Sequence, residues 1–299
     1  MKLIFMGTPG FTLPVLDALH EKHEIVAIYT RAPKPAGHGM HLKKSAVHEW
    51  GEAHHIPVFT PMTLKNEEVQ KQIKDFGAEA IIVYAYAMMI PSAILNATPK
   101  GCINIHPSLL PRWRGAAPII RAIQAGDKET GVSLMRLDEG WDTGPVFVQE
   151  KVAISPDDTP TTLGQKLNDL AVPMLIKLLD NFHEPVAQCD DGACYAPKLE
   201  KAEMAIDWSL PAEQIERNIR AFEGGFFLLN GKRVKVLKAK VLEGSGAIGT
   251  TIDDNLDVAC GKGILSLEIL QKEGKKPTSK HDFLLGTKVE KGTNLCATN

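Results

Sequence analysis

The amino-acid sequence predicts an α/β fold with a mostly parallel sheet, followed by a small β-barrel. In the first half of the 299-residue chain, short apolar runs alternate with helical segments. Around residues 183–205 the sequence becomes polar and mixed, and short strand-like runs with glycine turns follow. These observations indicate a larger sheet-and-helix domain and a smaller β-rich domain.

Four short apolar runs in the first half are expected to form buried strands. They occupy residues 2–6, 24–30, 80–86 and 102–106. Helical segments lie between them, at 13–23 and 45–55, and a longer one follows at 162–182. Apolar strands separated by helices indicate βαβ units, so the sheet should be parallel and buried on both faces.

The second half predicts one helix and then several short strands. They are expected at residues 211–222 for the helix and 232–242, 246–252, 255–261 and 263–270 for the strands. Short strands at regular spacing are typical of a small barrel. We therefore expect an N-terminal domain at 1–190, a linker at 191–205 and a C-terminal domain at 206–299.

The composition is that of an ordinary soluble globular protein, with 44% hydrophobic and 23% charged residues and a formal net charge of −2. The five cysteines show no C-x-x-C spacing, which indicates reduced cytosolic thiols. The N-terminal apolar run breaks at Gly7, which favours a buried strand over a signal peptide. No apolar stretch approaches the roughly 20 residues that a membrane-spanning helix needs.

One local patch is strongly basic although the whole chain is not. Residues 231–240 contain five basic side chains and no acidic one. Such a strand can be a solvated edge that resists aggregation, or a surface for nucleic acid. The residues alone leave both interpretations open.

The segment NIHPSLLPRWRGAAPI, residues 104–119, contains the first candidate catalytic groups. Asn104 and His106 alternate with isoleucines, so they project from one face near the carboxyl end of a strand, where open α/β sheets bind ligands. Histidine is the usual general base near neutral pH, and an Asn amide can donate a hydrogen bond to an oxygen that gains negative charge. With no nucleophile motif such as GxSxG, the pair predicts direct transfer of an acyl-type group between bound substrates.

A second segment, GVSLMRLDEGWDTGP at 131–145, combines a predicted strand with an acidic loop. Asp138, Glu139 and Asp142 are candidates to orient and polarise His106. Two alternatives remain open from the residues alone. Asn104 and His106 can serve only local hydrogen bonds, and the acidic loop can be an ordinary Asp/Gly turn.

Together these segments resemble the folate-dependent formyltransferases. The similarity extends to residues 3–11, 35–47 and 205–222, so it covers most of the chain, and the whole pattern is similar to the members that act on methionyl-tRNA. The resemblance implies a Rossmann-like formyltransferase domain and an OB-like C-terminal barrel. It further implies transfer of the formyl group of 10-formyltetrahydrofolate to the α-amino group of methionyl-initiator tRNA, for translation initiation, without a metal.

The resemblance also implies roles for individual residues. Those matching the family's catalytic trio are Asn104, His106 and Asp142. Those implied for folate binding are Ser108, Leu109, Leu110 and Pro111, with backbone groups from Tyr84 to Ile90. Those implied for tRNA binding are Arg31, Lys34, His38, Lys43, Lys44, Lys232, Arg233 and Lys235. The family usually has Arg at the position of His38. The resemblance implies a monomer in the bacterial cytoplasm, with a mitochondrial matrix left open by the sequence.

Several rival functions remain. A formyltransferase acting on a small amine, such as an amino-sugar nucleotide, would keep the trio but need no basic barrel face. A hydrolase would release formate from the same folate with water in place of the amine. A tRNA-binding module without activity would tolerate His106→Ala. A dinucleotide site is excluded because GTPGF at 7–11 lacks the G-x-G-x-x-G pattern.

Overall fold

The computed structural model describes residues 1–36 and 41–296, so His38 lies outside the described residues. Its internal contacts divide the chain into two compact units. The first unit comprises Met1–Gly115, Glu129–Ala153 and Gly164–Ala196. The second comprises Ala116–Lys128, Ile154–Leu163 and Pro197–Asn299. Neither unit is one continuous stretch of sequence, and the expected linker at 191–205 stays a prediction.

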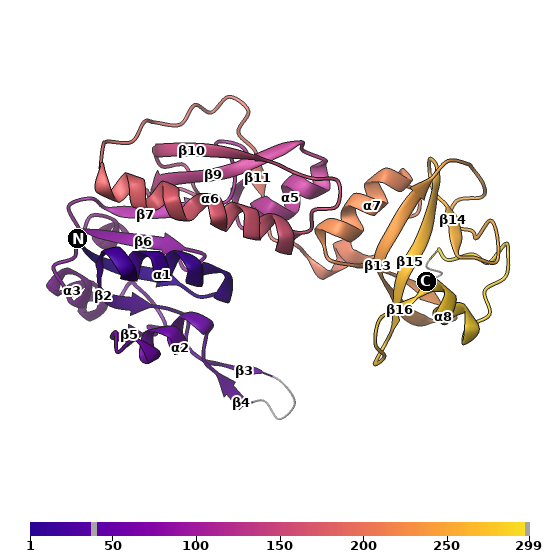
Figure 1. The fold of residues 1–299 in the computed structure, drawn as a ribbon, viewed down its shortest axis with the longest axis horizontal. Coiled ribbons are helices and arrows are strands. Elements are labelled where there is room, and N and C mark those ends of the chain that lie inside the picture. The colour runs from indigo at the N-terminus through magenta and orange to yellow at the C-terminus, as the bar shows by residue number, and fades with distance from the viewer. Residues whose placement is uncertain (37–40, 297–299) are drawn as a thin grey trace. The chain divides into compact units, whose positions relative to one another are not determined.

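The first unit is built on a seven-stranded sheet in the order β10-β9-β7-β6-β1-β2-β5 (Figure 1). Its strands are β1 (Lys2–Gly7), β2 (Glu24–Tyr29), β5 (Val58–Phe59), β6 (Ala80–Tyr84), β7 (Cys102–His106), β9 (Glu129–Arg136) and β10 (Val146–Ala153). The pairs from β5 through β7 are parallel, whereas β9 is antiparallel to both β7 and β10. The mostly parallel sheet expected from the alternating pattern is confirmed.

Helices cover this sheet as the apolar strands require. They are α1 (Leu13–Lys22), α2 (Ala46–Ala53), α3 (Glu67–Asp75), α4 (Ser92–Leu95) and α6 (Pro160–Asp180). Ile73 of α3 and Ile94 of α4 pack in one buried cluster with Ile4 of β1, and α1 and α6 pass in front of the strands in Figure 1. Ser45 and Asn66 cap α2 and α3 by accepting backbone N–H groups of the first turn.

Two short strand pairs lie outside the main sheet. A hairpin is formed by β3 (Lys34–Ala36) and β4 (His41–Lys43). A parallel pair is formed by β8 (Arg114–Gly115) and β11 (Tyr195–Ala196). Within residues 1–36 and 41–296, no helix has the length and apolar character to cross a bilayer.

The second unit contains a five-stranded antiparallel sheet in the order β12-β13-β15-β14, with β16 paired to β15. Its elements are α5 (Pro118–Ala125), α7 (Ala212–Ala221), β12 (Gly225–Leu229), β13 (Lys232–Leu242), β14 (Asp257–Ala259), β15 (Ile264–Lys272), β16 (Thr278–Ser279) and α8 (Lys280–Leu285). Ile215 and Ile219 of α7 pack on Val236 and Leu265 of the sheet. Closure of this sheet into a barrel stays a prediction.

The strand expected at 246–252 is wrong. That segment makes only isolated bridges, at Thr250 and Thr251. Gly249 has φ +71, a left-handed conformation that interrupts an extended strand. Gly246 and Gly249, which the expectation placed within a strand, therefore lie inside a loop.

Arg121 ties α5 to the start of the C-terminal segment within the second unit. Its side chain is nearly buried, and Nη1 and Nη2 donate to the two carboxylate oxygens of Glu203 at 2.6 and 2.9 Å. Its Nε donates to the Pro197 carbonyl at 3.0 Å. A buried guanidinium needs such a complete set of partners because desolvation of the charge is costly.

Candidate active site

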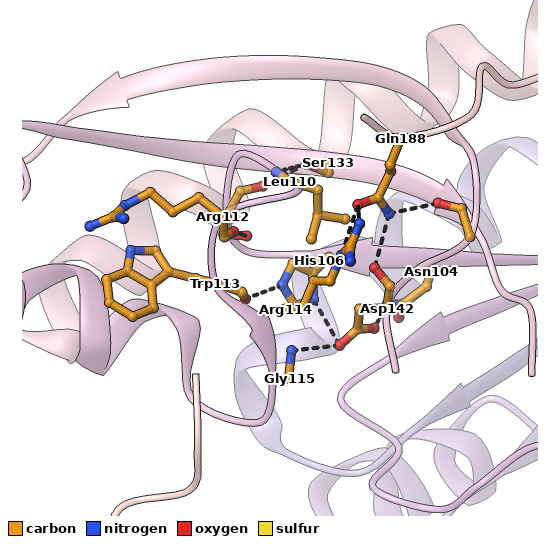
Figure 2. A network of polar contacts seen from close by, with 12 residues as sticks. Asn104, His106, Leu110, Arg112, Trp113, Arg114, Gly115, Ser133, Asp142 and Gln188 are labelled. Atoms are coloured by element: carbon orange, nitrogen blue, oxygen red, sulfur yellow. Dashed lines mark hydrogen bonds and ion pairs between the residues drawn. The ribbon is translucent and has the colours of Figure 1, made fainter. Parts of the chain in front are cut away.

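Asn104 and His106 lie on the same face of β7, with His106 at its carboxyl end, and both are buried. Asp142 comes from the loop between β9 and β10 and points toward both side chains (Figure 2). Its Oδ2 lies 3.7 Å from Nδ1 of His106, and its Oδ1 accepts from Nδ2 of Asn104 at 3.5 Å. The structure thus brings together an imidazole, a carboxamide and a carboxylate from two distant parts of the sequence.

The hydrogen bonds of His106 assign its ring nitrogens. Nε2 lies 2.8 Å from the carbonyl oxygen of Trp113. A carbonyl only accepts hydrogen bonds, so Nε2 carries a proton and donates it to Trp113. In the neutral ring, Nδ1 is then the nitrogen free to take up a proton, and it faces the Asp142 carboxylate. A carboxylate in that position stabilises the imidazolium that forms.

Of the three acidic candidates, only Asp142 reaches His106 among the contacts of the described residues. Asp138 instead accepts from Gly140 N and from Thr143 Oγ1, at 3.0 and 2.9 Å, within its own loop. Glu139 accepts a hydrogen bond from Ser92. The acidic loop therefore contains both a local turn and the carboxylate at the site.

Asp142 is held in an uncommon backbone conformation. Its φ is +54, in the left-handed region, which costs an L-residue roughly 1–2 kcal/mol. Its Oδ2 accepts the backbone N–H of Gly115 at 2.9 Å. The loop must therefore be stabilised by its neighbours to keep this carboxylate beside β7.

The segment after His106 is anchored to the neighbouring strands. Ser133 Oγ of β9 donates to the Ser108 carbonyl at 2.6 Å and accepts from Leu110 N at 3.1 Å. Gln149 of β10 donates to the Leu110 carbonyl at 2.8 Å. Ser108 and Leu110 are buried, whereas Leu109 and Pro111 are partly exposed. Sequence reasoning missed Ser133 and Gln149, although Ser133 lies directly across from His106 in the register.

Tyr84 and Ile90 flank the loop that follows β6. Both are buried, and the Tyr84 hydroxyl donates to Oδ1 of Asn168 on α6 at 2.7 Å. Burial raises the pKa of Tyr84, so the phenol stays neutral and acts as a donor. Ala85 and Ala87 between them have positive φ values of 52 and 59. The Tyr84 hydroxyl is thus committed to Asn168.

Replacement of Tyr84 by Phe tests this assignment. Tyr84→Phe leaves the Asn168 oxygen without its buried donor, so we expect the free energy of unfolding to fall by about 1–3 kcal/mol. The KM for the folate that the resemblance implies should not change, because the hydroxyl faces Asn168. Denaturant unfolding and steady-state kinetics measure the two quantities. A raised folate KM at unchanged stability would place the hydroxyl in the ligand site instead.

Cys102 lies at the start of β7 but is not available as a nucleophile. It is fully buried, and burial raises the pKa of its thiol to about 12. A neutral buried thiol is unreactive, in agreement with a transfer that forms no covalent enzyme intermediate. Within the part of the chain that the structure describes, no group of three or more His, Cys, Asp or Glu is arranged to hold a metal ion.

The basic residues predicted for tRNA lie in both units. In the first unit, Lys34 and Lys43 are directly paired across the β3–β4 hairpin. Arg31 Nη1 donates to the Ala87 carbonyl at 2.8 Å, and Lys44 Nζ pairs with Glu52 at 2.6 Å. Like charges directly opposite each other destabilise a strand pair.

In the second unit, the alternation along β13 separates the basic residues from the core. Val234 and Val236 are in the buried cluster, whereas Arg233 and Lys235 project from the other face. The Arg233 guanidinium lies 3.9 Å from the centre of the Phe226 ring. Lys232 is exposed at the start of the strand. The three predicted residues are therefore close in sequence, but only Arg233 and Lys235 share a face.

The sequence is similar to known proteins along most of its length. The family model for formyl transferase matches residues 1–179, and that for the formyl transferase C-terminal domain matches residues 198–288. A methionyl-tRNA formyltransferase of Cereibacter sphaeroides is 44% identical over 298 residues, covering 98% of each chain. One of Brucella canis is 47% identical over 304 residues, covering 97% of this chain and 99% of the relative.

A solved structure supports the fold. It is WlaRD, a sugar 3N-formyl transferase determined in the presence of dTDP and 5-N-formyl-THF. The TM-score is 0.65 at 17% identity, and the match covers 92% of this chain and 99% of that one. At this identity the likeness concerns the fold alone.

Proposed function

Because the chain belongs to the methionyl-tRNA formyltransferase family, we propose that it transfers the formyl group of 10-formyltetrahydrofolate to the α-amino group of methionyl-initiator tRNA through Asn104, His106 and Asp142. The observation that carries this proposal is the convergence of these three side chains in a chain 44–47% identical to such enzymes. The experiment that tests it is an assay of purified protein with labelled formyl-folate and charged initiator tRNA.

In the proposed reaction each residue has a distinct task. The amine attacks the formyl carbon, a C–N bond forms, and the carbonyl oxygen becomes negatively charged. One Asn104 Nδ2 hydrogen faces Asp142, which leaves the other to donate to that oxygen. His106 Nδ1 takes the proton that the amine loses and returns it to the folate nitrogen when the original C–N bond breaks. Asp142 stabilises the imidazolium between these two transfers.

The folate is proposed to bind beside this trio. Its contacts would come from Ser108, Leu109, Leu110 and Pro111, and from backbone groups between Tyr84 and Ile90. Two features support this assignment. The segment carrying the first four residues begins next to His106 and is anchored to β9 and β10, and the loop after β6 is shaped by left-handed alanines.

The tRNA is proposed to contact residues of both units. The contacts are assigned to Arg31, Lys34, His38, Lys43, Lys44, Lys232, Arg233 and Lys235, with 206–299 as an OB-like tRNA-binding domain after a linker at 191–205. The like-charged pair of Lys34 and Lys43 and the exposed cations of β13 support this. We also propose that the enzyme works as a monomer in the bacterial cytoplasm and needs no metal, since one chain contributes the whole trio and the relatives are bacterial.

Removal of the β13 charges should weaken tRNA binding without changing chemistry. In the variant Lys232→Gln, Arg233→Gln, Lys235→Gln we expect a higher KM for tRNA and an unchanged kcat. Each lost phosphate contact should flatten the slope of log affinity against log salt by roughly 0.7–0.9. Kinetics at several salt concentrations measure both effects.

The matched control removes three exposed lysines elsewhere in the second unit, with Lys275→Gln, Lys276→Gln and Lys291→Gln. It should leave the tRNA KM close to that of the parent protein. An unchanged tRNA KM in the β13 variant would exclude this strand from tRNA binding. Formylation of an amino-sugar nucleotide in preference to methionyl-tRNA would support the small-amine alternative.

A further inference from the structure

Gln188 lies at the upper right of the polar network in Figure 2, between Arg114 and the Asp142 loop, and follows Asp142 by 46 residues in the sequence. Its Nε2 donates to the carbonyl oxygens of Asp142 and Gly144, at 2.9 and 2.7 Å. Its Oε1 accepts from Nε and Nη2 of Arg114, at 3.1 and 2.9 Å. All the hydrogen-bonding capacity of this one side-chain amide is therefore used.

The chemistry of these partners fixes the orientation of the amide. Two carbonyl oxygens can only accept, and a guanidinium can only donate. The nitrogen of Gln188 must therefore face the Asp142 loop, and the oxygen must face Arg114. A carboxylate of the same shape at this position would meet two carbonyl oxygens with no proton to share.

Arg114 and Gly115 together hold both the side-chain carboxylate and the backbone carbonyl of Asp142. Gly115 donates its backbone N–H to the Asp142 carboxylate at 2.9 Å. Arg114, the preceding residue, reaches the Asp142 carbonyl through Gln188. The Arg114 guanidinium is in turn held by Asp190 at 2.9 Å. This clamp acts on the residue whose left-handed backbone conformation needs external support.

We propose that Gln188 is a positioning residue that holds the Asp142 carboxylate in its working geometry beside His106. This inference rests on the proposed function of Asp142. Gln188 touches neither His106 nor Asn104 in the contacts of the described residues, so it acts through the Asp142 loop. A small displacement of a catalytic group lowers the rate strongly, because proton transfer and charge stabilisation depend steeply on distance and angle.

The decisive variant is Gln188→Glu, which keeps the length and the acceptor for Arg114 but loses both N–H donors. We expect kcat to fall roughly 10- to 100-fold, while the KM values for folate and methionyl-tRNA stay near those of the parent protein. The matched control is Gln70→Glu, in which a Gln amide of α3 likewise loses its bond to a backbone carbonyl, that of Leu64. It should keep the parental kcat.

A double variant separates positioning from general structural support. If Gln188 acts through Asp142, adding Gln188→Glu to Asp142→Asn causes no further loss of kcat. Multiplication of the two losses would overturn the inference. If Gln188→Glu does not fold, Gln188→Ala is measured instead, both alone and combined with Asp142→Asn. The alanine removes the hydrogen bonds without placing a carboxylate against two carbonyl oxygens.

The outcomes distinguish the positioning role of Gln188 from the proposed catalytic role of Asp142. Parental kcat in Asp142→Asn would overturn the proposed role of Asp142 itself. A strongly reduced kcat in Asp142→Asn with parental kcat in Gln188→Glu would overturn only the positioning role. Parallel losses of thermal stability and of both KM values, with kcat unchanged, would also overturn it, because they indicate structural support alone.

Discussion

His106→Ala is expected to lower kcat for formylation of methionyl-tRNA by roughly 10²–10⁴-fold, the scale of lost acid–base catalysis. The variant removes the nitrogen that takes the proton from the attacking amine and returns it to the folate. Substrate contacts outside the ring remain, so the KM values should change far less than kcat. Single-turnover measurement of formyl transfer gives the chemical step directly.

The control for this variant is His183→Ala. His183 also lies in the first unit, and its Nε2 is 3.1 Å from the Phe147 carbonyl oxygen. Nε2 of His106 makes the same kind of contact with the Trp113 carbonyl oxygen. Loss of that ring should leave kcat unchanged. Full formylation activity in His106→Ala would exclude this ring as the catalytic base, whereas tRNA binding with no formylation in the parent protein would favour a tRNA-binding module without activity.

Asp142→Asn is expected to lower kcat by a similar factor, roughly 10²–10⁴-fold. The amide keeps the size of the carboxylate but removes the charge that stabilises the imidazolium of His106. The backbone N–H of Gly115 can still donate to the amide oxygen, so the loop should remain folded. Kinetics of formyl transfer, together with a thermal unfolding curve, measure the two effects.

Glu139→Gln is the matched control, because it removes one negative charge from the same loop. Glu139 is exposed and bonds Ser92, away from His106. It should therefore keep the parental kcat. An equal loss in both variants would mean that the net charge of the loop, and not the carboxylate beside His106, supports catalysis.

The sequence predicted the part of the site that strand alternation determines. Asn104 and His106 are two residues apart on an apolar strand, so they had to share a face. The acidic loop is not a strand, so alternation could not decide which of its three carboxylates faces His106. The choice of Asp142 depends on a left-handed backbone angle and on the N–H of Gly115, neither of which follows from residue spacing.

Contacts over long sequence separations were beyond this kind of reasoning. Gln188 lies in a mixed polar segment with no periodicity, and its partners become visible only when the chain is folded. The same limit applies to the division of the fold. Residues 116–128 and 154–163 cluster with the C-terminal segment, which no composition boundary along the chain can reveal.

The partners of Arg121 bear on how such a protein can be divided. Arg121 belongs to α5, within the region that matches the N-terminal family model, but its guanidinium pairs with the Glu203 carboxylate and donates to the Pro197 carbonyl. A fragment ending near residue 190 would lack these partners, so the face of α5 around Arg121 would be open to water. Division of the gene at that point is therefore disfavoured, because it separates α5 from the rest of the second unit.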